Sequence, residues 1–210
     1  MAYALAHAGG LWARLHANER LALLLAALCH DFEHPGVSAA YLHKAQSRLA
    51  AWVRADQGLL EKHHSVRAYE LLACKRIGLL AHLRLPTPDR VEVRGLVREL
   101  ILATDMSQHG PILAGIEECL SAPGLPAGGE SVGEERGRRL QWLRLVVKCA
   151  DVSNVTKGFA TAMEWGVMVT DEMFAQGDRE RAEGLEVRER ERACSGRALA
   201  RLADESGRVD

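Results

Sequence analysis

Four ionisable side chains follow an apolar run near the start of the sequence. In the stretch "LLLAALCHDFEHPG", six apolar residues and a cysteine precede His30, Asp31, Glu33 and His34. Burying a carboxylate without a partner is costly, so an acid at the end of an apolar helix needs a cation, a set of hydrogen bonds or water. These four residues are therefore the first candidates for chemistry.

A second apolar stretch ends in the same way. "LQWLRLVVKCAD" runs into Asp151, so the sequence offers two carboxylates and an imidazole at helix ends. Histidine and carboxylate together suit zinc, and a carboxylate shared with a second, harder ion suits magnesium or manganese. The alternative for the pair His30 and Asp31 taken alone is a buried hydrogen bond between the two side chains.

Composition limits the kinds of partner. The chain has 210 residues, of which 48% are hydrophobic and 26% charged, and this is enough apolar content for the core of one domain. A formal net charge of −1, from 27 basic and 28 acidic residues, gives no field of one sign that would attract nucleic acid or anionic lipid. Composition therefore identifies no partner by itself, and we expect neither nucleic-acid nor membrane binding.

Cysteine usage and apolar runs indicate an intracellular protein. The five cysteines form no CxxC pair and are odd in number, which suits reduced thiols in the cytoplasm better than a disulfide framework. The longest apolar run, residues 21–29, is half the length that a bilayer requires, and no secretory signal follows Met1. We expect a cytoplasmic location.

The periodicity of apolar residues is helical almost throughout, and no run of alternating β-branched residues stands out. The sequence therefore predicts an all-α fold, a compact bundle of roughly eight helices. Asn18 is the expected N-cap of an interior helix that Pro35 and Gly36 stop, and Thr87 is the expected cap of another helix with Pro88 in its first turn. Further helices are expected over 58–83, 138–151 and 156–177.

Two segments differ in composition from the rest. Residues 121–137 hold five glycines and two prolines, which favours a mobile loop. From Asp178 onward the chain is charged and poor in large apolar residues, which indicates an exposed helix that frays into a tail. We therefore expect one domain over 1–186 and a disordered tail over 187–210.

Five blocks along the sequence occur in a characteristic order and spacing. They are "HDFEHPGVSAAYL", "LLEKHHSVRAYELL", "LILATDMSQH", "CADVSNVTK" and "FAQGDRERAEGLE". These blocks resemble the catalytic domain of the class I, mammalian-type 3′,5′-cyclic nucleotide phosphodiesterases, which belong to the HD metallohydrolase superfamily. The resemblance runs from His30 to Glu186, about three quarters of the chain.

The resemblance implies a centre of two divalent metals, zinc with magnesium or manganese. His30, Asp31 and Asp151 match three of the four zinc ligands, and Asp31 also matches the carboxylate that reaches the second metal. The fourth ligand is a histidine followed by alanine. We choose His7 over His16, because family members often carry another histidine nine positions after the ligand, and a short deletion must then follow.

The implied reaction is hydrolysis of a 3′,5′-cyclic nucleotide to a 5′-monophosphate, with a water or hydroxide that bridges the metals as the nucleophile. His34 and Glu61 match residues that hydrogen-bond metal-bound water. Thr104 and Asp105 match residues that line the metal and water cavity, and Asn154 matches a position on the nucleotide-facing wall. Taken alone, His34 reads as a turn cap and Glu61 as a first-turn acid that the helix dipole favours.

Other matched residues have structural readings. His63 and His64 resemble the family's histidine pair, which we expect to pack and hydrogen-bond beneath the site, although ordinary half-buried histidines would give the same pattern. His109 belongs to the block of Thr104 and Asp105. The segment "QGDRERAEG" is expected to stabilise the fold through charge pairs and a turn.

Departures from the family limit the functional prediction. Tyr3 occupies the position of the histidine proposed as general acid, and Glu33 replaces the usual aspartate. The N-terminal helices of the family are missing, and no glutamine and phenylalanine that would hold a purine follow Glu186, so cyclic AMP and cyclic GMP cannot be distinguished. The alternative to an active enzyme is an impaired phosphodiesterase fragment or a metal-binding interaction module. A hydrolase of some other phosphate ester is a weaker third reading.

Overall fold

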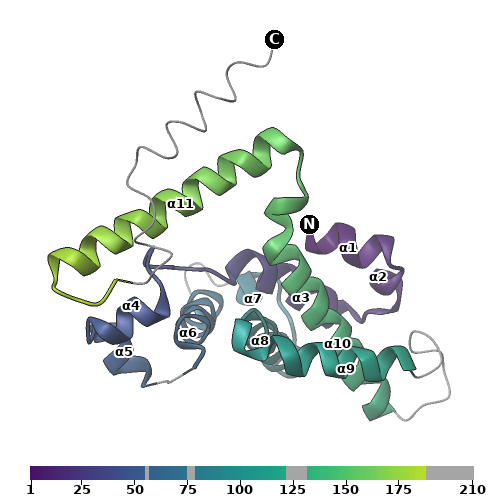
Figure 1. Cartoon of the computed structure of the whole chain (residues 1–210). Coiled ribbons are helices and arrows are strands. Elements are labelled where there is room, and N and C mark those ends of the chain that lie inside the picture. Colours follow the sequence, from purple (N-terminus) through teal and green to yellow (C-terminus); the bar gives the residue numbers. More distant parts are fainter. Residues whose placement is uncertain (55–56, 75–78, 122–131, 188–210) are drawn as a thin grey trace. The chain divides into compact units, whose positions relative to one another are not determined.

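The computed structural model describes residues 1–54, 57–74, 79–121 and 132–187 (Figure 1). All regular elements among these residues are helices, eleven α-helices and two 3₁₀ helices. The predicted all-α fold is therefore confirmed, with more helices than the expected eight. Within the described ranges no helix has both the length and the apolar character needed to cross a bilayer.

The chain divides into two compact units, which are described separately. The first comprises Met1–His34 and Ala55–Ser153, and the second comprises Pro35–Arg54 and the chain from Asn154 onward. The single domain expected over 1–186 stays a prediction, and the tail expected over 187–210 lies outside the described residues from residue 188 onward. The first unit contains α1 (Ala2–Ala8), α2 (Leu11–Arg14), α3 (Ala17–Cys29), α6 (Leu59–Ala73), α7 (Leu79–His82), α8 (Thr87–Leu102), η1 (Met106–Gln108), α9 (His109–Ser121) and α10 (Val132–Asp151).

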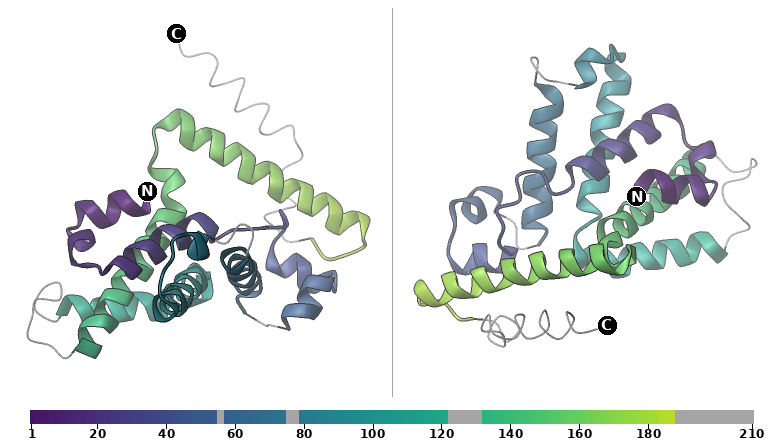
Figure 2. Two further views of the ribbon diagram at one scale, coloured as in Figure 1. Left: turned by 180° about the vertical axis from the view of Figure 1, so that it is seen from behind. Right: turned by 90° about the horizontal axis from the view of Figure 1, so that it is seen from above.

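The core of the first unit forms where α3 and α6 pack against α8 (Figures 1 and 2). Apolar side chains from several helices fill it, and those that are completely or almost completely buried include Leu23, Leu59, Leu100, Ile101 and Leu143. Helix α3 was expected to be interior on every face. That prediction is wrong for one face, because Leu24 is 43% and Leu28 80% exposed.

Helices α3 and α10 run in the same direction. Near their starts Arg139 Nε donates to Glu19 Oε1 at 3.0 Å, and at their ends His30 Nε2 lies 3.1 Å from Asp151 Oδ1. Arg139 and Glu19 are 3% and 5% exposed, so their ion pair is buried. The two apolar helices that end in acids are thereby brought together at those ends.

The starts of two helices differ from the prediction. His16, not Asn18, is the N-cap of α3, and the Asn18 amide donates instead to Asp89 and Glu92 at 3.1 and 2.7 Å. Tertiary contacts with α8 thus replace the expected cap. Pro86, not Thr87, is the N-cap of α8, whereas a proline in the first turn is confirmed.

Helix ends also differ. Helix α3 ends at Cys29, before the ionisable residues and well before Pro35. The helix expected over 58–83 is present as α6 and α7, with residues 75–78 outside the described part. Of the loop expected over 121–137, residues 132–137 belong to α10, where Glu135 accepts from Arg139 one turn later at 2.7 Å.

The second unit contains α4 (Ala39–Lys44), α5 (Arg48–Val53) and α11 (Phe159–Ala182), while η2 (Val152–Thr156) crosses the boundary. Gln176 Oε1 accepts from the Ser38 backbone at 2.7 Å, and Gln176 Nε2 donates to the completely buried Glu180 at 3.3 Å. Lys44 Nζ lies 3.5 Å from Glu180 Oε1. The segment "QGDRERAEG" thus stabilises this unit, as expected.

Candidate metal centre

His30, Asp31 and Asp151 form a group whose possible ligand atoms all lie within 4.8 Å of one another. His30 is the C-cap residue of α3, Asp31 follows it, and Asp151 is the last residue of α10. His30 Nε2 lies 3.1 Å from Asp151 Oδ1 and 3.3 Å from Asp31 Oδ2. Parallel packing of α3 and α10 therefore brings together three predicted ligands that are up to 121 positions apart.

The His30 ring is oriented by the backbone. Its Nδ1 lies 3.0 Å from the Ala27 carbonyl, which can only accept, so Nδ1 carries a proton and Nε2 faces the two carboxylates. The hydrogen bond to Asp151, then that to Asp31, raises the pKa of His30 to about 10. The hydrogen bond from His30 in turn lowers the pKa of Asp31. The group thus presents carboxylates that attract a cation, and a metal would compete with one proton for Nε2.

The donor set fits a divalent metal. Ligand atoms that are each about 2.0–2.1 Å from a tetrahedral zinc ion lie about 3.3–3.4 Å apart. The two nitrogen–oxygen distances of 3.1 and 3.3 Å in this group are close to that separation. The hydrogen bond from Nδ1 to a backbone carbonyl is also the arrangement typical of a metal-ligating histidine.

Glu61 lies in the first turn of α6 and is half-buried. Burial raises the pKa of its carboxyl, and the nearby charges of Asp105 and Asp31 raise it further, whereas Lys148 lowers it. An acid with these neighbours holds a proton more readily than an exposed glutamate does. This property suits the predicted hydrogen bond to a metal-bound water.

Thr104 and Asp105 follow the end of α8 and make local hydrogen bonds. The Thr104 hydroxyl donates to the Ile101 carbonyl at 2.8 Å. Asp105 accepts from the Ser107 amide at 2.8 Å and from the Ser107 hydroxyl at 2.6 Å, and so caps η1. Asp105 Oδ2 also packs so closely on Gly58 that a Cβ there would lie 2.8 Å from it.

Two histidine rings stack beside Asp31. The rings of His34 and His64 have centroids 5.5 Å apart and are nearly parallel. His64 is buried, and its Nδ1 donates to the Phe32 carbonyl at 2.9 Å, while its Nε2 lies 3.8 Å from Asp31 Oδ1. Burial lowers the pKa of His64. The expected packing role of this histidine is therefore confirmed.

The next histidine contacts the same segment. His63 Nε2 lies 3.3 Å from the Glu33 carbonyl. Glu33 itself accepts two hydrogen bonds from Arg67, at 2.6 and 2.8 Å, and this contact lowers the pKa of the Glu33 carboxyl. The longer side chain of Glu33 thus binds a surface arginine.

Tyr3 and His7 lie on α1. Both residues are exposed, and their rings are 5.6 Å apart, with the Trp12 ring 4.9 Å from Tyr3. His7 does not belong to the group of possible ligands that contains His30. His16, the histidine not chosen as ligand, is exposed at the start of α3.

The remaining matched residues lie in other elements. His109 is exposed at the start of α9. Asn154 belongs to η2 and to the second unit, so its predicted place on a nucleotide-facing wall stays a prediction.

Sequence reasoning missed Lys148. This lysine of α10 is buried, and its ammonium donates to three backbone carbonyls of the segment that carries Thr104 and Asp105. The available signal was a single cation within the apolar run "LRLVVKCAD". Its partners lie more than forty positions away, so the sequence alone could not identify them.

Known proteins are similar to this chain in sequence and in fold. Residues 1–200 match the family model described as 3′5′-cyclic nucleotide phosphodiesterase. The chain therefore belongs to the 3′5′-cyclic nucleotide phosphodiesterase family.

Individual relatives agree with the family match. The chain is 34% identical over 169 residues to mouse 3′,5′-cyclic-AMP phosphodiesterase 4C, and 32% identical over 169 residues to the probable 3′,5′-cyclic-AMP phosphodiesterase pde-4 of Caenorhabditis elegans. In each case the match covers 80% of this chain, and it covers 24% and 25% of the two relatives. The chain thus spans about a quarter of the length of these relatives.

A solved structure supports the fold. The crystal structure of the phosphodiesterase domain of the RhoPDE fusion protein from the choanoflagellate Salpingoeca rosetta matches with a TM-score of 0.74 and 29% identity. The match covers 90% of this chain and 57% of that one. The all-α arrangement described above is therefore that of a phosphodiesterase domain.

Proposed function

We propose that this chain hydrolyses 3′,5′-cyclic nucleotides to 5′-nucleoside monophosphates. The observation that carries the proposal is the group formed by His30, Asp31 and Asp151, whose spacing and orientation suit a divalent metal. The family to which the chain belongs is named for this reaction, and relatives that it matches are named cyclic-AMP phosphodiesterases.

The proposed centre holds zinc together with magnesium or manganese. His30, Asp31 and Asp151 would hold the zinc ion with His7 as the fourth ligand, and Asp31 would also reach the second ion. When bound, such ions supply a Lewis acid for the phosphoryl oxygens and lower the pKa of a water molecule toward neutrality. A cytoplasmic location also stays a prediction, which rests on the cysteine pattern.

The chain's own residues would orient water and substrate and move protons. Glu61, whose burial raises its pKa, and His34 would accept or donate hydrogen bonds to the attacking water. Thr104 and Asp105 would line the cavity on one side, and Asn154 would contact the nucleotide. Tyr3, which matches in sequence the position of the proposed general acid, would give a proton to the departing 3′ oxygen.

A second candidate function is a metal-binding interaction module without turnover. It is favoured by the exposed position of Tyr3 and His7 on α1 and by the tyrosine in place of a histidine acid. A tyrosine of ordinary pKa, about 10, is a weaker acid than histidine, and a well-matched proton donor contributes about 100- to 10,000-fold in rate.

Phosphorus-31 NMR of cyclic AMP and cyclic GMP hydrolysis tests the proposal. The purified chain with zinc and magnesium should release the 5′-monophosphate, and Asp31→Ala should release none, because it lacks a ligand that both ions share. Full turnover by Asp31→Ala would contradict the assignment of the site. A folded, metal-loaded chain without turnover would instead favour the interaction module.

A further inference from the structure

Lys148 is a buried cation at the edge of the candidate centre. It lies on α10, three residues before Asp151, and is only 7% exposed. Its Nζ donates to the carbonyls of Ala103, Thr104 and Asp105 at 3.2, 3.3 and 3.1 Å. An ammonium group has three N–H donors and no acceptor, so these three contacts use its full donor capacity.

The three carbonyls belong to the turn in which α8 ends. The last carbonyls of an α-helix have no partner within the helix, and the helix dipole makes them a favourable site for a cation. Of the three carbonyls, that of Ala103 belongs to the C-cap residue of α8, and those of Thr104 and Asp105 follow the helix end. Lys148 donates to all three in a buried position, where unpaired polar groups are costly. Lys148 therefore adds three contacts from another helix to the local hydrogen bonds of this turn.

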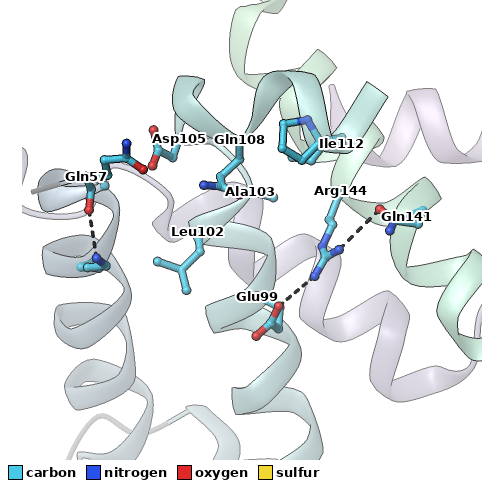
Figure 3. A pocket seen from close by; sticks show the side chains of 12 residues that line it. Gln57, Glu99, Leu102, Ala103, Asp105, Gln108, Ile112, Gln141 and Arg144 are labelled. Atoms are coloured by element: carbon cyan, nitrogen blue, oxygen red, sulfur yellow. Dashed lines mark hydrogen bonds and ion pairs between the residues drawn. The ribbon is translucent and has the colours of Figure 1, made fainter. Parts of the chain in front are cut away.

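The turn borders a cavity on one side. Ala103, Asp105 and Gln108 line a cavity of about 440 Å³, which is otherwise lined by residues of α6, α8, α9 and α10 and of the residues just before α6 (Figure 3). On another side Asp105 meets Gly58, which has a positive φ of 62° and leaves no room for a Cβ. Contact with Gly58 therefore confines the Asp105 side chain on that side of the turn.

We propose that Lys148 is a positioning residue that holds the turn of Thr104 and Asp105 in register with Asp151. Because Lys148 and Asp151 lie one turn apart on α10, the same helix carries a proposed metal ligand and contacts the turn that is proposed to line the metal cavity. The catalytic part of this inference rests on the proposed function. The structural part does not, since it concerns contacts within the first unit alone.

Amide hydrogen exchange of the turn tests the structural part. The amides of Thr104, Asp105 and Gln108 donate to backbone carbonyls, and that of Ser107 donates to the Asp105 carboxylate. In Lys148→Met, which keeps the apolar stem but loses the donors, exchange over 103–108 should accelerate about 10- to 100-fold. Zinc affinity should stay within about threefold, because His30, Asp31 and Asp151 keep their contacts.

Arg144→Met is the matched control. Arg144 lies one turn before Lys148 on α10 and donates to Glu99 of α8 at 2.9 Å, so it joins the same two helices without contacting the turn (Figure 3). Exchange over 103–108 should stay within about twofold of the parent chain in this control. Lys148→Arg keeps the charge and the N–H donors, so it should retain most of the protection of residues 103–108 from exchange. This variant still tests the proposal if Lys148→Met does not fold.

Kinetics test the catalytic part. With metal bound, Lys148→Met should lower kcat about tenfold or more and change KM less, and Lys148→Arg should recover part of that loss. Exchange that rises equally over the whole of α8 and α10, or no change over 103–108, would overturn the positioning role. Absence of turnover in the parent chain would contradict the proposed function, while the exchange result would still decide the role of Lys148 in the turn.

Discussion

The first unit holds two places where predicted ligands occur, and they differ in how their histidines are held. At the ends of α3 and α10, His30 is fixed by a backbone carbonyl on one nitrogen and two carboxylates on the other. On α1, His7 is exposed and lies beside the ring of Tyr3. A ligand whose ring is already oriented loses little freedom when it binds, so we expect the helix ends to dominate metal affinity and His7 to add to it.

The largest effect is expected from the contact that holds α3 and α10 together. Arg139→Met leaves Glu19 buried without its partner, and removing one member of a buried ion pair costs about 3–5 kcal/mol. Urea unfolding followed by circular dichroism measures this loss. The control is Arg67→Met, which breaks an exposed pair with Glu33 and should cost much less, because solvent screens that pair. Equal losses in the two variants would show that the buried pair does not hold the helices.

Removal of a ligand at the helix ends comes next. Asp151→Ala should weaken zinc binding by more than the roughly 10- to 100-fold that loss of an outer hydrogen-bond partner costs. Competition with a chromophoric chelator gives the dissociation constant. Glu33→Gln, a change of an exposed acid near the site, should leave that constant within about twofold. Unchanged affinity in Asp151→Ala would remove α10 from the metal site.

The contribution of His7 to zinc affinity can be measured separately. If it joins the three residues as the fourth ligand, His7→Ala should weaken zinc binding about 10- to 100-fold, less than Asp151→Ala. His16→Ala, the other histidine followed by alanine, should leave the affinity unchanged. Equal zinc affinities in the parent chain and in His7→Ala would mean that, of the four candidate ligands, only His30, Asp31 and Asp151 bind the ion.

A further effect concerns pH. The pKa of His30 is raised from 6.5 to about 10 in the folded, metal-free chain. Its contribution to the free energy of unfolding is therefore fully present below pH 6.5 and is lost as the pH rises toward about 10. The difference in urea midpoint between the parent chain and His30→Gln, measured with a chelator present, should shrink over that range. A difference that grows with pH would contradict the assigned contacts.

Much of the fold and of the site followed from the sequence. Apolar periodicity gave the all-α class, and the end of α10 at Asp151 was expected from the run of apolar residues before it. Family blocks identified His30, Asp31 and Asp151, and the structure brings these three together. Local patterns and a strong resemblance sufficed here because the predicted ligands lie directly at the ends of two apolar runs, which become α3 and α10.

Contacts between distant elements could not be predicted. Asn18 reads as a cap from its neighbours alone, but its amide binds Asp89 and Glu92 of α8 instead. Gly133 and Gly137 favour a loop, yet both belong to α10, which also carries Arg139 of the buried pair with Glu19. In each case a partner more than 70 positions away decides the local structure.

Diffraction from crystals grown with zinc, recorded at the zinc absorption edge, tests the central claim most directly. We expect an anomalous peak about 2.0–2.2 Å from His30 Nε2 and from carboxylate oxygens of Asp31 and Asp151. The same map shows whether His7 approaches the ion as the fourth ligand. A peak bound elsewhere, or none beside these three residues at full zinc loading, would contradict the metal centre and the hydrolysis proposed for it.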